Sequence, residues 1–481
     1  MNRGWSPDKV WREECGVFAA VGVPRAAEVV CLGLHALQHR GQESAGIVAC
    51  DERGEFHAHR GLGLVSDVFG DAEVARLPGS MGIGHNRYST TGALTRENTQ
   101  PLMVVYRGGP LALAHNGNLV NSSELRRSLE SAGSIFQTTL DTEIFLHLMA
   151  LSGSDDPQVA LIEAAKQVRG AYSLVVLTRE AVFALRDPHG FRPLCIGRLG
   201  DGYVVASETC ALDLVAADYV RDVAAGELVR IDPHGMRSIR PFEPQEPLRQ
   251  CVFEHIYFSR PDSRVFGVTV DRVRRRIGHQ LAREHPAAGD VVIAVPDSSN
   301  SIALGYSEAT GIPFELGLIR NHYVGRTFIQ PQQAGRDSSV RVKFNPVREV
   351  LAGKRVVLVD DSIVRGTTSR KLVRMLRRNG AEAVHFRVGS PPVTHPCFYG
   401  IDTPSRRELI AALKTPEEIR EFLGADSIGY LSLEGLLACE QDGQQFCRAC
   451  FTGRYPVTVD PGASKLSLEE IHRPLPFPER V

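Results

Sequence analysis

Apolar and polar positions follow two different patterns along the chain. Up to about residue 240, short apolar runs flank tight polar turns, as in "AGIVACDERGEFHAHRG", "YSLVVLTREAVFALRD" and "CIGRLGDGYVVASE". This pattern predicts antiparallel hairpins that turn at residues 52–54, 178–180 and 200–202. Helical stretches such as "TEIFLHLMALS" and "QVALIEAAKQV" lie between them, so we predict an α+β domain.

The second pattern follows a segment rich in proline and polar residues, "IDPHGMRSIRPFEPQEPLRQ", which we interpret as a domain boundary. In "GDVVIAVPDSSNSIALGYSEATGIP" and "GKRVVLVDDSIVRGTTSRKLVRMLRRNGAEAVHFRVGS", an apolar strand leads through a polar loop into a helix. Such alternation is typical of an α/β parallel sheet covered on both faces. We therefore predict a leader over residues 1–14, domains over 15–245 and 246–455, and an extended tail over 456–481.

Composition limits the class of protein. The 481 residues carry a formal net charge of −1, with 43% hydrophobic and 23% charged residues. This is ordinary globular material without a basic surface for nucleic acid, and no apolar run approaches the roughly 20 residues that span a bilayer. Ten cysteines do not make a disulfide scaffold in so long a chain. We expect a cytoplasmic, reducing setting, with neither nucleic acid nor membrane as a partner.

A polar leader, "MNRGWSPDKVWREE", precedes Cys15 and a short apolar run. Its scattered charges exclude a secretory signal, which needs an apolar core of roughly 7–15 residues. Two interpretations remain from the residues alone: a frayed terminus without function, or a propeptide whose removal makes Cys15 the first residue. In the second case the cysteine would carry its own base, because a free α-amine has an ordinary pKa of about 7.7–8.0.

The stretch "RVVLVDDSIVRGTTS" combines several features of a ribose-phosphate site. Asp360 and Asp361 end a buried strand, where ligands bind in open α/β sheets. The segment Arg365, Gly366, Thr367, Thr368 and Ser369 begins a helix, whose backbone N–H groups and dipole attract an anion. The two carboxylates suit vicinal hydroxyls and a nearby Mg²⁺. Taken singly, these features are also those of a strand end and a helix cap; together they favour a ribose phosphate.

This loop resembles the phosphoribosyl-pyrophosphate motif of type I phosphoribosyltransferases. The resemblance implies that Ser298 in "VPDSSNS" contacts magnesium or pyrophosphate, beside Mg²⁺ held by Asp360 and Asp361. It also implies a mobile loop, for which "YVGRTFIQPQQAGRDSSVRVKFNP" is the candidate. Its basic residues suited to pyrophosphate are Arg326, Arg336, Arg341 and Lys343. A solvated surface loop is the alternative.

The first domain carries a separate set of motifs: "CGVFA", "LQHRGQESAG", "GHNRYSTTG", "AHNGNL" and "DTE". These resemble the N-terminal-nucleophile glutamine amidotransferases, whose domain is an αββα sandwich. From Cys15 to about Arg454 the whole chain resembles the amidophosphoribosyltransferases. That resemblance implies synthesis of 5-phosphoribosylamine from glutamine and phosphoribosyl pyrophosphate, the first committed step of purine synthesis. It further implies a homotetramer and feedback inhibition by purine nucleotides.

The resemblance also implies roles for individual residues of the first domain. Cys15 is the expected nucleophile, so the leader is expected to be a propeptide. Arg87 would bind the α-carboxylate of glutamine, and Asp141 its α-ammonium. Asn116 and Gly117 would form the oxyanion hole, although Asn-Gly alone is also a turn signal. For His39, His85 and His115 we expect structural hydrogen bonding.

Four further cysteines fit a metal centre. Cys447 and Cys450 form "CRAC", while Cys251 and Cys397 stand alone. Four such thiolates suit Zn²⁺ or an iron–sulfur cluster, and a lone CxxC would also suit redox chemistry. The resemblance implies a [4Fe–4S] cluster, as in one branch of the family. The other five, Cys31, Cys50, Cys195, Cys210 and Cys439, have no such role, and the first four of these are expected to be small buried residues.

Two other functions share part of these features. A glucosamine-6-phosphate-forming amidotransferase would share the first domain but would lack "VVLVDDSIVRGTTS". A regulatory sensor that binds a ribose phosphate would share the second domain but would have no use for the glutaminase residues.

Overall fold

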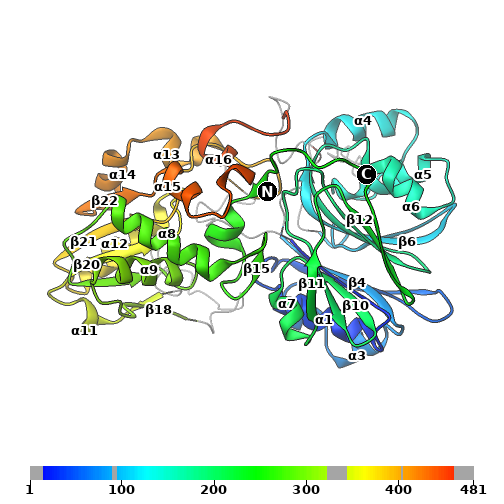
Figure 1. The fold of residues 1–481 in the computed structure, drawn as a ribbon, viewed down its shortest axis with the longest axis horizontal. Helices are drawn as coiled ribbons and strands as arrows, with labels where there is room; N and C mark the ends of the chain where they lie inside the picture. The colour runs from blue at the N-terminus through cyan, green and yellow to red at the C-terminus, as the bar shows by residue number, and fades with distance from the viewer. Residues whose placement is uncertain are drawn as a thin grey trace, which may run out of the picture.

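The computed structural model describes residues 15–88, 95–321, 344–401, 403, 405–459 and 468. The leader and most of the basic loop, including Arg326, lie outside these residues. In Figure 1 the described chain forms two bodies side by side, with the blue and cyan part at the right and the yellow and orange part at the left. No helix within the described ranges is long and apolar enough to cross a membrane.

The first domain contains a seven-stranded antiparallel sheet. Its strands follow the order β11 (Asp218–Asp222), β9 (Cys195–Leu199), β10 (Gly202–Ala206), β1 (Gly16–Val21), β4 (Met81–Arg87), β2 (Ser44–Cys50) and β3 (Phe56–Leu62). The predicted turns at residues 52–54 and 200–202 join β2 to β3 and β9 to β10. Strand β1 lies inside the sheet between β10 and β4, which places Cys15 at the end of a central strand.

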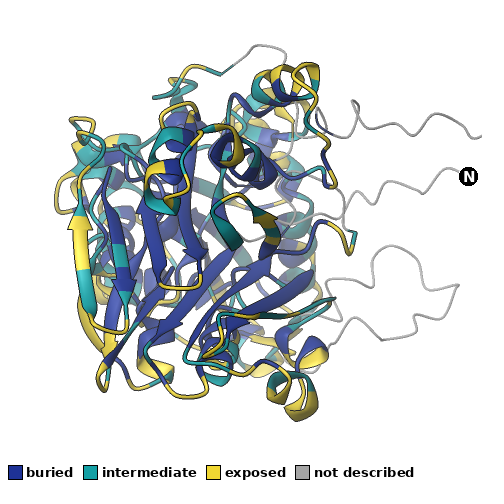
Figure 2. Ribbon diagram, turned by 90° about the vertical axis from the view of Figure 1, so that its right-hand side faces the viewer, coloured by how far each residue is buried: buried dark blue, intermediate teal, exposed yellow. Residues whose placement is uncertain are grey.

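A second antiparallel sheet of six strands faces the first. Its order is β13 (Gly235–Ile239), β12 (Leu228–Asp232), β8 (Val182–Arg186), β7 (Gly170–Leu177), β6 (Gly109–Leu119) and β5 (Leu102–Tyr106). The turn predicted at residues 178–180 joins β7 to β8. Apolar residues such as Val17, Ile83 and Val175 fill the space between the sheets, so buried residues run along the facing strands in Figure 2.

Helices cover the outer faces of both sheets and complete an αββα sandwich. The first sheet packs against α1 (Ala26–Ala36), α2 (Val65–Val68), α3 (Asp71–Ala75) and α7 (Cys210–Leu214). The second packs against α4 (Ser122–Ser131), α5 (Thr142–Leu151) and α6 (Pro157–Ala165). Cys50, Cys195 and Cys210 are buried as predicted, whereas Cys31 is only partly buried because it lies beside the apolar stripe of α1.

The second domain is built on a parallel sheet, as its pattern predicts. The order is β17 (Val291–Ala294), β20 (Arg355–Asp360), β21 (Ala383–Val388) and β22 (Ser427–Tyr430). Helices α8 (Val270–Glu284) and α9 (Asn300–Thr310) cover one face. Helices α11 (Arg348–Leu351), α12 (Thr367–Arg378), α13 (Ile410–Leu413) and α14 (Pro416–Leu423) cover the other. Alternate residues of β20 enter opposite cores, which explains its unbroken apolar run.

Short elements join the two domains. A π-helix, η1 (Glu254–Phe258), follows β14 (Gln250–Cys251), which pairs in parallel with β23 (Phe446–Cys447). Among the described residues, the other elements are the hairpins β15 (Arg264–Val265) with β16 (Val268–Thr269) and β18 (Leu318–Arg320) with β19 (Phe344–Pro346), the helices α15 (Leu433–Ala438) and α16 (Ala449–Thr452), and the 3-10 turns η2 (Arg406–Glu408) and η3 (Gly443–Gln445).

Candidate active sites

Cys15 lies at the end of β1, buried and only 7% exposed. Gly16 pairs with Asn86, so the chain before β1 continues beside the end of β4. There the Cys15 thiol donates to the Tyr88 carbonyl at 3.5 Å. The Cys15 carbonyl accepts a hydrogen bond from Arg40 Nε at 3.2 Å. This guanidinium contact is a feature that no sequence prediction included, although "LQHRGQESAG" contains Arg40.

The two sheets meet beside this cysteine. Arg87 ends β4 and is buried. Two residues earlier, His85 Nε2 lies 3.1 Å from the carbonyl of His115, which belongs to β6 of the other sheet. Asn116 and Gly117 follow directly along β6. The structure therefore brings the ends of β1, β4 and β6 together, although the three strands are far apart in the sequence.

Asn116 and Gly117 have the properties of an oxyanion-binding pair. The Asn116 side chain is buried, and its Nδ2 finds no hydrogen-bond partner among the described residues. A buried amide N–H without an acceptor costs free energy, unless a ligand accepts its hydrogen bond. Gly117 has φ +151°, and a Cβ there would lie 2.0 Å from the carbonyl oxygen of Ala171. Only glycine fits at this position. The Asn-Gly pair lies within strand β6 and does not form the turn that this dipeptide signals elsewhere.

Asp141 lies next to these residues, at the N-cap of α5. Its Oδ2 accepts from the Leu119 backbone N–H at 2.9 Å, which fixes α5 to the end of β6. Burial alone raises the pKa of Asp141, but nearby His115 and the hydrogen bonds outweigh burial, so its pKa lies below the ordinary value. The group is therefore a buried carboxylate, suited to an ammonium ligand.

The three histidines of the motifs make local hydrogen bonds. His115 Nδ1 lies 3.2 Å from Thr142 Oγ1, and its Nε2 lies 3.3 Å from the Ala171 carbonyl. His39 Nε2 lies 2.8 Å from Glu208 Oε1. Burial lowers the pKa of His85 to about 3, so this ring is neutral and cannot act as a proton-accepting base that becomes charged at neutral pH.

The second site lies at the carboxyl ends of β17 and β20. Ser298 Oγ donates to Asp361 Oδ1 at 2.7 Å, and Ser299 Oγ donates to Asp360 Oδ1 at 3.2 Å. Both carboxylates are buried. Burial and the adjacent charge of Asp361 raise the pKa of Asp360 well above its ordinary value. A cation bound here would relieve both effects, and this set of carboxylate and hydroxyl oxygens fits Mg²⁺.

The phosphate loop follows as its sequence predicts. Gly366, with φ +71°, is the N-cap of α12, and Thr367, Thr368 and Ser369 form the first turn of that 12-residue helix. Backbone N–H groups and the helix dipole are thus available to a phosphate. Arg365 forms an ion pair with Glu408 at 2.8 Å. Arg326, Arg336, Arg341 and Lys343, expected at the pyrophosphate, lie outside the described residues.

The four predicted metal-binding cysteines come together from distant parts of the second domain. Cys251 and Cys447 are paired residues of β14 and β23. Burial and then the neighbouring Cys447, Cys397 and Cys251 raise the pKa of Cys450 well above the ordinary thiol value. Cys439, the C-cap of α15, instead donates to the Gly435 carbonyl at 3.2 Å. Burial and the neighbouring thiols both disfavour thiolate charge here, and a cation would relieve both effects, so the set fits a metal centre.

Comparisons with known proteins cover nearly the whole chain. The glutamine amidotransferase domain family matches residues 85–214. The chain is 53% identical to an amidophosphoribosyltransferase of Vigna aconitifolia, covering 95% of each protein. It is 51% identical to that of Bacillus subtilis, covering 93% of this chain and 95% of that one.

Two solved structures are similar over the same extent. One is described as the allosteric regulatory enzyme of purine biosynthesis, with a TM-score of 0.90, 49% identity, and coverage of 95% of this chain and 99% of that one. The other is the B. subtilis glutamine phosphoribosylpyrophosphate amidotransferase complexed with ADP and GMP, with a TM-score of 0.89, 49% identity, and coverage of 94% of this chain and 100% of that one.

Proposed function

This chain belongs to the amidophosphoribosyltransferase family, and we propose that its two sites divide the family's reaction between them. The enzyme uses glutamine to convert phosphoribosyl pyrophosphate to 5-phosphoribosylamine in purine biosynthesis, releasing glutamate and pyrophosphate. The comparisons do not favour a glucosamine-6-phosphate-forming enzyme. The assignment of steps to residues is our proposal, and it rests on the geometry of the two sites.

In the first site, Cys15 is the nucleophile after removal of residues 1–14. Its free α-amine accepts the thiol proton, and Sγ attacks the amide carbon of glutamine. The carbon–nitrogen bond then breaks, the nitrogen leaves as ammonia with that proton, and a glutamyl thioester remains. Water hydrolyses the thioester to glutamate and restores the thiol. Asn116 Nδ2 donates no hydrogen bond to any described residue, which supports its role as a donor to the oxyanion.

The neighbouring charges are suited to the two ends of glutamine. Arg87, buried at the end of β4, binds the α-carboxylate as a bidentate donor. Asp141, held as a carboxylate by nearby His115 and by its hydrogen bonds, binds the α-ammonium. The Gly117 N–H completes the oxyanion hole beside Asn116. Together these groups place the amide carbon opposite Cys15. The free energy of binding glutamine is thus used to orient the reacting atoms.

In the second site, the α12 N-terminus holds the 5-phosphate and the two carboxylates hold the ribose hydroxyls. Arg365, Gly366, Thr367, Thr368 and Ser369 form the phosphate cradle. Mg²⁺, when bound by Asp360, Asp361 and Ser298, supplies charge neutralisation of the pyrophosphate. Ammonia reaches this site internally and attacks carbon 1 of the ribose as the bond to pyrophosphate breaks. Arg326 is proposed as a pyrophosphate contact from the basic loop.

The four cysteines Cys251, Cys397, Cys447 and Cys450 are proposed to hold a [4Fe–4S] cluster with a structural role. Among the described residues, no three of their sulfur atoms lie within 4.8 Å of one another. A single zinc at about 2.3 Å from each tetrahedral ligand would place the sulfurs about 3.8 Å apart. This arrangement is compatible with an iron–sulfur cluster, which is larger than one zinc ion.

The family relationship is the basis on which we propose how this enzyme is regulated and assembled. The related B. subtilis structure is complexed with ADP and GMP, which supports our proposal that purine nucleotides inhibit this enzyme. We also propose a homotetramer and a cytoplasmic location.

The proposal that the two sites catalyse separate steps rests on where their functional groups lie. The nucleophile and oxyanion donors lie at the ends of β1 and β6, while the phosphate loop follows β20 of the other domain. Phosphoribosylamine synthesis should be assayed with glutamine and, separately, with ammonium at alkaline pH. Cys15→Ala should abolish only the first activity, and Asp361→Asn should damage both. Loss of both activities in a folded Cys15→Ala protein would contradict the proposal.

A further inference from the structure

Arg40 joins the glutaminase site to the second domain. Its guanidinium is fully buried in the protein. Nε holds the Cys15 carbonyl, while Nη1 and Nη2 donate to the two carboxylate oxygens of Glu254 at 2.9 and 2.8 Å. Glu254 belongs to η1, in the second domain. One planar cation thus connects the backbone of the proposed nucleophile to a carboxylate 239 residues away in the sequence.

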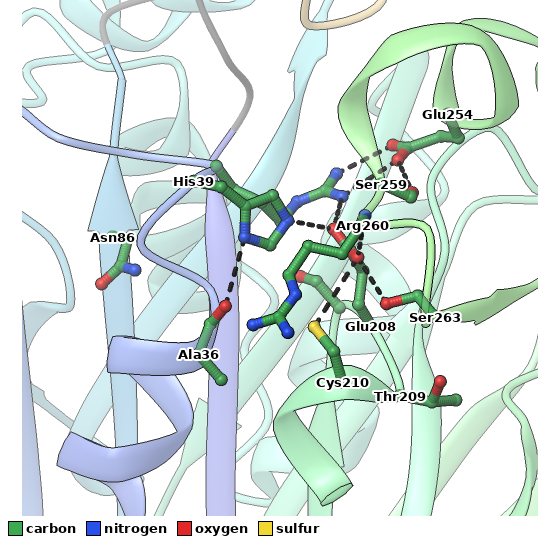
Figure 3. A network of polar contacts seen from close by, with 12 residues as sticks. Ala36, His39, Asn86, Glu208, Thr209, Cys210, Glu254, Ser259, Arg260 and Ser263 are labelled. Atoms are coloured by element: carbon green, nitrogen blue, oxygen red, sulfur yellow. Dashed lines mark hydrogen bonds and ion pairs between the residues drawn. The ribbon is translucent and has the colours of Figure 1, made fainter. Parts of the chain in front are cut away.

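The connection is part of a reciprocal pair of contacts between the domains, and Figure 3 labels the two carboxylates that take part, Glu208 and Glu254. Glu254, from the second domain, also accepts from Arg192 of the first domain at 3.4 Å and from Ser259 Oγ at 2.7 Å. Glu208, from the first domain, accepts from the Arg260 N–H at 2.9 Å and Ser263 Oγ at 2.7 Å. Glu208 also binds Arg40 Nη1 at 2.5 Å.

Each carboxylate has a different relation to the nucleophile. Glu208 accepts from Arg40 Nη1, while Glu254 accepts from both Nη1 and Nη2 and therefore fixes the plane of the guanidinium. That plane determines where Nε points, and Nε is the atom that holds the Cys15 carbonyl. Leaving a buried charge without one of its partners is strongly destabilising. The guanidinium of Arg40 therefore keeps the orientation that satisfies Glu254.

From this geometry we propose that Glu254 is a positioning residue for the glutaminase reaction. The inference rests on Cys15 being the N-terminal nucleophile proposed above. Such a residue has no preceding peptide group to restrain it, so its carbonyl is a backbone anchor close to the thiol and the α-amine. By holding that carbonyl, Arg40 fixes rotation about the Cα–C bond of Cys15, and Glu254 acts through Arg40. The glutaminase site is therefore incomplete without the second domain.

The test compares the mature Glu254→Gln enzyme, with both domains present, with the mature wild type. This substitution keeps the size of the side chain but presents an NH₂ group to Arg40 in place of one carboxylate oxygen. We expect the kcat for glutamine hydrolysis to fall at least 10-fold with a smaller change in KM, because the thiol and amine are misplaced rather than the glutamine-binding groups. Ammonia-dependent synthesis should stay within 3-fold. Equal loss of both activities, or no loss of either, would overturn the inference.

Two further measurements separate the possible failures. Alkylation by the glutamine analogue 6-diazo-5-oxonorleucine reports directly on Cys15, by mass spectrometry of the labelled peptide. Absence of Cys15 labelling in the wild type would overturn the proposed nucleophile itself. Labelling of Glu254→Gln at the wild-type rate would overturn only the role of Glu254.

Control variants keep the test independent of folding. Glu308→Gln removes an exposed partner of Arg275 in the same domain and should change neither activity. If Glu254→Gln does not fold, Ser259→Ala removes only the hydroxyl donor to Glu254 Oε2. It should lower glutamine hydrolysis about 3-fold and spare the ammonia reaction. An equal effect on both reactions, or none on either, would count against the proposal.

Discussion

Gly400 of the second domain packs directly against Gly117 of the first. A Cβ at Gly400 would lie 3.1 Å from both Cα and the carbonyl carbon of Gly117. The residues just before Gly400 are also hydrogen-bonded to the first domain. Asn118 Nδ2 donates to the Phe398 carbonyl at 3.0 Å, and Arg192 Nη2 donates to the Tyr399 carbonyl at 2.6 Å. The backbone of the proposed oxyanion hole is thus supported from the domain that does not contain it.

Gly400→Ala should therefore damage glutamine hydrolysis selectively. Gly400 also has φ +103°, which alanine rarely adopts, so the backbone must move by tenths of an ångström against Gly117. Loss of an oxyanion donor costs on the order of 10²–10³ in rate, and partial displacement should cost about 10-fold. Steady-state assays with glutamine and with ammonium measure the difference.

The matched control is Gly311→Ala. Gly311 also has a positive φ, +72°, but a Cβ there meets nothing within 4 Å. This variant should lose stability without a selective loss of glutaminase activity. Similar activity profiles for the two variants would show that backbone strain alone, and not contact with Gly117, explains the effect.

The mature enzyme should begin at Cys15. Only then does the cysteine have the free α-amine that serves as its base. Intact-mass measurement of active protein should give the mass of residues 15–481. A Cys15→Ala protein provides the comparison, because removal of the leader by self-cleavage would fail there. Full activity with residues 1–14 still attached would contradict the assignment.

Anaerobically purified enzyme should be brown and contain about four irons and four sulfides per chain. Cys447→Ser should lose most of this iron, since Cys447 lies beside Cys251 in the paired strands. Cys439→Ser should keep it, because the Cys439 thiol donates to a helix carbonyl. Stoichiometric zinc without sulfide in the wild type would show that the group is misassigned.

Glu208 should make part of the protein's stability dependent on pH. Burial by itself raises the pKa of the Glu208 carboxyl, but neighbouring His39 and Arg40 outweigh it and lower the pKa to about 2. Because the pKa is lower in the folded state, the ionised carboxylate stabilises the fold fully at pH values above 4.5, the pKa in the unfolded state. This stabilisation is lost as the pH falls towards 2, the pKa in the folded state. The free-energy advantage of wild type over Glu208→Gln in urea unfolding should shrink by roughly 1 kcal/mol between pH 7 and pH 4. A constant difference over that range would refute the assignment.

Much of the fold and of the chemistry was present in the sequence by itself. The hairpins at residues 52–54, 178–180 and 200–202 were predictable because strand alternation and turn residues are local signals. The apolar run of β20 predicted a strand buried on both faces, and the motif after it predicted a helix that starts within residues 365–369, where α12 begins at Thr367. Short motifs likewise identified Cys15, Asn116 and Asp361 as candidates, since their chemistry depends on residue type and close spacing.

Tertiary structure alone decided how these candidates are held. The pairing of Arg40 with Glu254 and the packing of Gly400 on Gly117 join residues more than 200 positions apart. No local periodicity encodes such contacts, because they arise only when the two domains bury their facing surfaces together. The sequence alone predicts that a charged side chain such as Glu254 is exposed to solvent. In the structure it is fully buried beside Arg40 and Arg192. The cost of removing a charge from water is offset only where the fold supplies opposite charges and hydrogen bonds from elsewhere in the chain.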